Sequence, residues 1–118
     1  MDRTDATLDG PIDSATIGET IHRALRIGSG RPDFEELGAL ESDLRGHIAL
    51  LLPEAREAAA RLWHGSIEAH RLMARLDGIE RQTTQGLGHG PLSAHVQVHQ
   101  LARDCQYLLA RHTAAARP

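Results

Sequence analysis

The stretch AHVQVHQLARDCQYLLARH, residues 94–112, decides the fold. Its apolar positions recur in alternating steps of four and three residues, the spacing of a helix face that packs against other helices. Nowhere does the chain show the apolar-polar alternation of a half-buried strand. This row of apolar positions, called the seam below, predicts a long C-terminal helix. Its inner face would carry Ala94, Val98, Leu101, Cys105, Leu108 and His112.

The same rhythm runs through residues 37–62 and keeps its phase past Pro53. This favours one long helix that starts near Phe34 and is kinked at the proline, which removes a backbone hydrogen bond. The alternative is two helices with Pro53 at the first position of the second. Asp33 with Glu36 fits a capping box at the start of this segment.

Two further helices are expected over about residues 16–27 and 67–84, each with an apolar face at helical spacing. Thr16 with Glu19 fits a capping box for the first of them. The glycines and proline of residues 86–91 form the connection to the last helix. Short connections favour antiparallel neighbours.

The predicted fold is therefore all-α, an up-and-down bundle of three long helices plus a short N-terminal helix. A chain of 118 residues supports one core. We expect the bundle domain to span residues 14–113, between a flexible leader over 1–13 and a flexible tail over 114–118.

Composition excludes several classes of function. The net charge is -3 and the arginines are scattered among acidic residues, so the basic patch needed to bind nucleic acid is missing. No apolar run is long enough to cross a bilayer, and the first ten residues are acidic where a signal peptide would be basic. These features predict a cytoplasmic protein without nucleic-acid or membrane partners. The single Cys105 is expected to be a small core residue.

Eight histidines in a chain with three aromatic residues are the unusual feature of the composition. His95 and His99 are four residues apart, so on a helix both imidazoles would face one side, within reach of a shared metal ion. His47 and Glu54 share one flank of the long helix, and Glu80 has a comparable position on the next. Convergence of these side chains would create an inter-helix pocket.

The alternative interpretation pairs Glu54 or Glu80 with an arginine of a neighbouring helix, which would set the helix register without any chemistry. The arginines available for this are Arg71, Arg75 and Arg103. The Glu-x-x-His pattern of di-iron bundles is absent at both glutamates. No serine has the neighbouring base that nucleophilic catalysis requires.

Residues 44–54, LRGHIALLLPE, resemble the hallmark of a family of small actinobacterial (Streptomyces-type) proteins labelled natural-product biosynthesis proteins. Further likeness lies in IHRAL at 21–25, IER at 79–81 and HQLAR at 99–103, and the resemblance covers roughly residues 17–112. The segment WHGS at 63–66 departs from the family pattern. The positions that match its motifs are Arg45, Gly46, His47, Pro53, Glu54, Glu80, His99 and Arg103.

These observations predict a non-catalytic accessory or interaction protein, which the resemblance associates with natural-product biosynthesis or its regulation. The alanine-rich second half of the long helix either lets a neighbouring helix approach closely or pairs with a second subunit, and we expect a homodimer. A protein partner in the pathway is the other expected contact. No cofactor is expected. The alternative is a bundle that binds a small molecule or a divalent metal, with an enzymatic role less favoured. Its ligand-binding residues would be Arg45, His47, Glu54, Glu80, His99 and Arg103, and its metal ligands His47, His95 and His99.

Overall fold

The protein is described by a computed structural model that covers residues 12–27, 33–84 and 91–116. Over these ranges the chain forms helices and no strand, which confirms the all-α prediction. The helices are α2 (Ser14–Arg26), α3 (Phe34–Ala60), α4 (Ile67–Thr83) and α5 (Pro91–Ala116).

Short side chains cap three of these helices. Asp33 accepts a hydrogen bond from the backbone N–H of Glu35, and Ser66 accepts one from Ala69. The expected capping box at Thr16 is wrong, because Asp13 is the N-cap of α2. Its carboxylate accepts hydrogen bonds from both the backbone N–H and the hydroxyl of Thr16, so the helix begins two residues earlier.

Helix α3 continues through Pro53 as a single element of 27 residues. The preferred interpretation of one long helix, rather than two helices that meet at the proline, is therefore confirmed. The bend expected at this residue stays a prediction.

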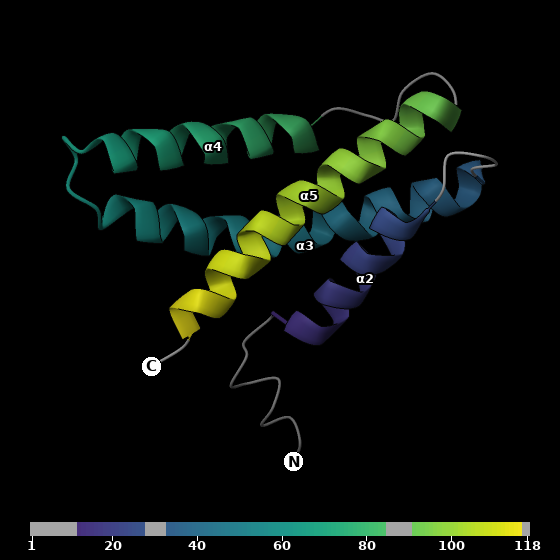
Figure 1. Cartoon of the computed structure of the whole chain (residues 1–118), viewed down its shortest axis with the longest axis horizontal. Helices are drawn as coiled ribbons and strands as arrows, with labels where there is room; N and C mark the ends of the chain where they lie inside the picture. The colour runs from purple at the N-terminus through teal and green to yellow at the C-terminus, as the bar shows by residue number, and fades with distance from the viewer. Residues whose placement is uncertain (1–11, 28–32, 85–90, 117–118) are drawn as a thin grey trace, which may run out of the picture.

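The four helices form a flat molecule, 19 Å thick along its shortest axis, which is about two helix diameters. In Figure 1, α3 and α4 form a hairpin, α2 lies beside the first half of α3, and α5 crosses in front of α3. Helix α5 contacts all three other helices, and it contacts α4 least. Because α5 crosses α3 diagonally in this view, the regular up-and-down bundle is not confirmed.

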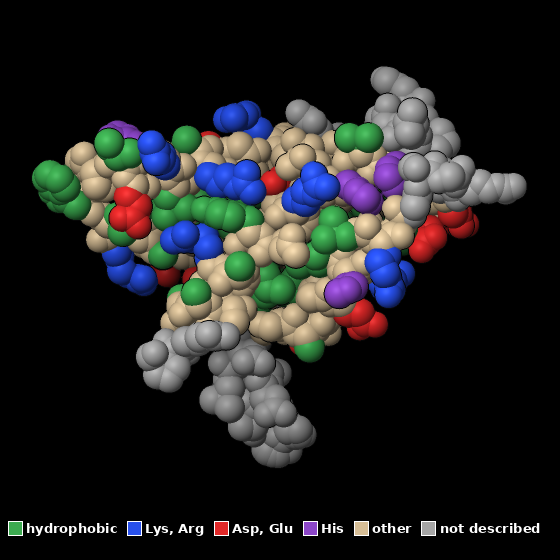
Figure 2. Space-filling model, in the orientation of Figure 1, with side chains coloured by type: hydrophobic (Ala, Val, Ile, Leu, Met, Phe, Trp, Pro, Cys, Tyr) green, Lys and Arg blue, Asp and Glu red, His purple; other side chains and the backbone are tan. Residues whose placement is uncertain are grey.

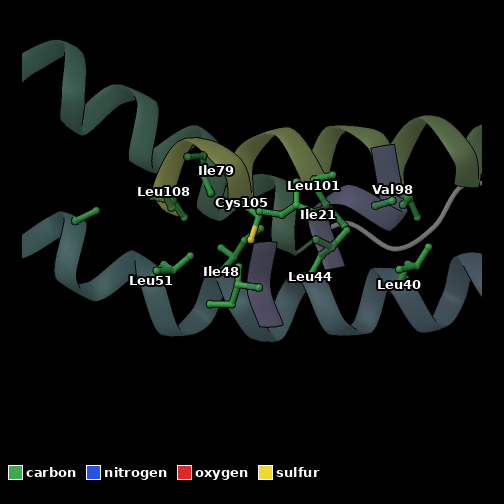
Figure 3. Close-up of a cluster of buried hydrophobic side chains, with 14 of the residues drawn as sticks. Ile21, Leu40, Leu44, Ile48, Leu51, Ile79, Val98, Leu101, Cys105 and Leu108 are labelled. Carbon is green, nitrogen blue, oxygen red and sulfur yellow. The ribbon is translucent and has the colours of Figure 1, made fainter. Parts of the chain in front are cut away.

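The core lies where α5 crosses α3 and α2, and the predicted seam forms its centre (Figure 3). All the seam positions from Ala94 to Leu108 are buried, whereas His112 is half-buried at the edge. Cys105 is fully buried, and burial raises the pKa of its thiol to about 12. The thiol therefore stays protonated at neutral pH, as expected for a small core residue.

The ends of the folded region differ from the expected domain limits of 14 and 113. Ile12 is 7% exposed and belongs to the core, and Asp13 caps α2. At the other end α5 continues to Ala116. Residues 1–11 and 117–118, the remainder of the expected leader and tail, lie outside the described residues. Within the described part of the chain, no helix is both long and apolar enough to cross a membrane.

Candidate functional site

The structure places His47 against α2, away from the other residues of the predicted pocket. Its Nε2 atom lies 3.2 Å from the hydroxyl oxygen of Thr20, and the side chain is half-buried. Burial lowers the pKa of His47, and the carboxylates of Asp43 and Asp13 offset part of this effect. A neutral imidazole here links α3 to α2.

Glu54 and Glu80 each have a separate partner on a neighbouring helix. Glu54 Oε1 lies 2.7 Å from Nδ1 of His112 on α5, while Glu80 on α4 forms an ion pair with Arg56 on α3. Arg56 also lies 3.1 Å from Asp77. These contacts agree in kind with the alternative of register-setting pairs, although the partners are not the arginines expected from the sequence.

His95 and His99 are brought together, as their spacing predicts, with ring centroids 4.4 Å apart. His95 Nε2 lies 3.0 Å from the carbonyl oxygen of Ile27, the C-cap of α2, so its N–H donates to a helix end. His99 Nε2 is buried and has no hydrogen-bond partner among the described residues.

Arg45 and Arg103, the two arginines of the predicted ligand-binding set, make none of the contacts described above for the histidines. Arg45 forms an ion pair with Glu41 one turn earlier on α3, and Arg103 is exposed on α5. Among the described residues, no group of three or more His, Cys, Asp or Glu side chains is placed to hold a metal ion. The metal set His47, His95 and His99 is therefore not gathered into one site.

A polar cluster that sequence analysis missed lies between α4 and α5, centred on Asp104. This carboxylate is almost fully buried and accepts a hydrogen bond from Gln100 at 3.2 Å. The nearest cation, Arg75, is 3.8 Å away, and its guanidinium stacks 4.5 Å from the ring centroid of Tyr107. Arg111 lies 5.9 Å from the same ring. Figure 2 shows arginine side chains spread over this face.

The sequence does contain a signal for this cluster. Asp104 lies three residues after Leu101 and next to Cys105, so it sits at the border of the seam, where a carboxylate must be at least partly buried. Burial raises the pKa of Asp104, whereas Gln100 and Arg75 act in the opposite direction.

We expect Asp104→Asn to raise the free energy of unfolding at pH 7, because the amide keeps the bond to Gln100 and removes a buried charge. The raised pKa of Asp104 in the folded state means that its ionisation destabilises the fold as pH rises above the unfolded value of about 3.9. The increase in the free energy of unfolding caused by Asp104→Asn should therefore reach its maximum above the folded-state pKa of Asp104 and vanish below about pH 3.9. Urea unfolding of both proteins from pH 3.5 to 7.5 measures it. A gain that does not change with pH would contradict this account.

A small notch separates the C-terminal half of α5 from the second half of α3. It has a volume of about 60 Å³, and its lining is mostly apolar, with Leu51, Ala55 and Ala58 on α3 and Leu108 on α5. The Glu54–His112 pair and Arg111 lie at its border. Two residues of the predicted ligand set therefore border hollows, Glu54 at this notch and Glu80 at a more open one that Asp77, Arg81 and Thr84 also line.

The end of the α3–α4 hairpin exposes large apolar side chains (Figure 2). Trp63 is 79% exposed, and Ile67 is 67% exposed. The backbone between them is ordered by a hydrogen bond of 3.0 Å from the N–H of Ser66 to the carbonyl oxygen of Trp63. Contiguous exposed apolar patches are typical of contact surfaces, and Trp63 and Ile67 lie four residues apart on the two sides of this turn.

Fold and surface together define a small all-helical protein with a closed apolar core, inter-helix ion pairs and an apolar hairpin end. The chain belongs to the family of unknown function DUF6415, whose model matches residues 15–117. No curated protein and no solved structure shows significant similarity to the chain. The family match extends over all four helices, and the actinobacterial and natural-product association stays a prediction.

Proposed function

We propose that this protein is a non-catalytic helical accessory protein that binds another protein chain through the end of the α3–α4 hairpin. The observation that carries the proposal is the exposure of Trp63 and Ile67 on an ordered turn. The association with natural-product biosynthesis comes from the sequence resemblance and is part of the proposal.

Tryptophan is among the residues that contribute most to protein interfaces, because it buries a large apolar area and loses little side-chain freedom. The chain has one tryptophan, and the fold leaves it outside the core. Its ring lies against the turn, since a Cβ atom added at Gly65 would be 3.6 Å from Trp63 Cη2. The side chain is therefore partly positioned before it meets a partner, which lowers the entropic cost of binding.

The test compares the wild type with Trp63→Ala and with Leu50→Ala, a control that removes another partly exposed apolar side chain of the same hairpin. Sedimentation equilibrium measures self-association, and a photo-crosslinking residue at position 67 captures partners in extracts of the source organism. We expect association or capture to be lost in Trp63→Ala and kept in Leu50→Ala, with unchanged helix content. A protein that stays monomeric and captures no partner would contradict the proposal.

The second candidate function is the binding of a small molecule or a metal ion. The notch between α3 and α5 favours a small molecule over a metal ion. Metal analysis of untagged protein after exposure to zinc, iron and copper distinguishes metal binding from binding of an organic molecule. A stoichiometry near zero with unchanged melting would leave an organic ligand as the remaining candidate.

A further inference from the structure

One face of the molecule gathers arginine side chains from both α4 and α5 (Figure 2). Arg71 and Arg75 lie one turn apart on α4, and Arg103, Tyr107 and Arg111 follow one another at turn spacing on α5. The guanidinium groups of Arg75 and Arg111 lie 4.5 Å and 5.9 Å from the ring centroid of Tyr107, which joins the two rows. These five residues are called the arginine face below.

Negative charge is scarce on the arginine face. Asp104 is the only carboxylate of α5, and it is 3% exposed, so it lies beneath the arginines and not among them. On α4, Asp77 and Glu80 pair with an arginine of α3, and Glu68 borders the face at the hairpin end. A chain whose net charge is -3 therefore carries a surface of local positive charge.

The cations of this face are accessible to a partner. The side chain of Arg75 is 45% exposed, and Arg71 and Arg103 are also exposed. Within the described ranges, Arg71 and Arg103 form no ion pair. Stacking on Tyr107 limits the motion of Arg75, which lowers the entropic cost of a further contact. An incoming anion would thus meet charges that the protein has not already neutralised.

The spacing of the arginines determines the size of the anion that fits. Residues four apart on a helix are about 6 Å apart along its axis, and alternate side chains of an extended peptide are about 6.6 Å apart. From Arg103 to Arg111 the helix rises about 12 Å, which is the length of about four residues of extended chain. The face therefore suits an extended segment of about four to six residues with acidic side chains at alternate positions.

An acidic peptide fits the face better than a nucleic acid does. Tyr107 is the aromatic residue of the face, and the guanidinium group of Arg75 covers its ring, so bases would find a poor stacking platform there. The planar fork of an exposed arginine matches the two oxygens of a carboxylate. The net charge of -3 opposes a long polyanion more than a short acidic segment that meets the face locally.

We propose that the arginine face binds a short, extended acidic segment of a partner protein, whose carboxylates pair with Arg71, Arg75 and Arg103. These arginines are scattered in the sequence, and the packing of α5 against α4 gathers them. The proposal goes beyond the hairpin interaction, because it concerns a different set of side chains and a partner recognised by its charge.

The experiment measures fluorescence anisotropy of a labelled peptide of about six residues, alternating glutamate and serine, as full-length protein is added. A matched peptide has glutamine in place of glutamate, and a thymidine oligonucleotide of equal charge represents nucleic acid. We expect saturable binding of the glutamate peptide, at least about tenfold weaker binding of the glutamine peptide, and weaker binding of the oligonucleotide. Raising the salt from about 20 to about 200 mM should weaken binding, because exposed charge pairs are screened.

Two double variants test the position of the site. Arg71→Gln with Arg103→Gln removes exposed charges of the arginine face. Arg23→Gln with Arg26→Gln makes the same change in net charge on α2, which packs on α3 and α5. We expect the first pair to weaken binding of the glutamate peptide at least about tenfold and the second pair to stay within about twofold of the wild type. Circular dichroism checks that each variant is folded.

Several results would overturn the proposal. Absence of saturable binding of the glutamate peptide at low salt is the first, and equal affinity for the two peptides is the second. Oligonucleotide binding as tight as that of the glutamate peptide would assign the face to nucleic acid. Equal losses in the two double variants would mean that net charge alone attracts the peptide. Because Trp63 is not part of the arginine face, each of these results leaves the hairpin interaction to its own test.

Discussion

Replacing Leu44 by alanine is expected to lower the free energy of unfolding by about 2–5 kcal/mol. Leu44 is fully buried on α3, and in Figure 3 it lies with Ile21 of α2 and Leu101 of α5. Removal of its isobutyl group loses the burial of apolar surface and leaves a cavity where three helices meet. In a protein of this size, that loss is a large part of the total stability.

The matched control is Leu50→Ala on the same helix, where the side chain is 40% exposed. We expect this change to stay within about 1 kcal/mol, because water already reaches the leucine. Urea unfolding followed by circular dichroism gives both values, and an unchanged m-value shows that the transition remains the same. Equal losses for the two variants would mean that the helices do not pack around Leu44 as described.

Replacing Pro53 by alanine is expected to raise the free energy of unfolding by about 1–3 kcal/mol. Pro53 is exposed within the 27-residue helix α3, so its side chain contributes little to the core. Proline has no N–H to donate to the carbonyl of Ala49, and its ring crowds the preceding turn. Alanine restores the donor and removes the clash, which should raise the melting temperature by roughly 4 °C or more.

Glu57→Ala is the control for this experiment, because Glu57 is exposed on the same helix and has one long contact with Arg61 at 3.9 Å. Its effect should remain within about 0.5 kcal/mol. The opposite result for Pro53→Ala, a clear loss of stability, would show that the bend expected at the proline is needed for the second half of α3 to meet α4 and α5. Thermal melting of the three proteins distinguishes these outcomes.

Much of the fold was predictable because helix formation and burial leave a periodic record along the chain. The seam from Ala94 to Leu108 was correct at each apolar position. The passage of α3 through Pro53 was also correct, since the apolar phase on both sides requires a single axis. The start of α2 was misplaced, because Asp13 and Thr16 are both good N-caps and only their mutual contact selects one.

The candidate site was much less predictable, since it depends on which flanks face each other. His47 and Glu54 do share one flank of α3, but α2 meets the first residue and the end of α5 meets the second. The position of Asp104 at the border of the seam is visible in the sequence, but only the packing of α5 against its neighbours makes its carboxylate almost fully buried. Separations of 24 to 58 residues between the inter-helix partners of Glu80 and Glu54 carry no periodic signal.

By itself, the order of residues determined that this chain is helical, where its helices lie to within a few residues, and which face of each is buried. Those properties follow from local sterics and from the spacing of apolar side chains along one axis. Only the tertiary structure decided that α5 crosses α3, that the predicted pocket residues separate into different contacts, and that a notch forms beside Arg111. The physical reason is that helix crossing depends on how whole surfaces interlock, and similar apolar stripes permit several such arrangements.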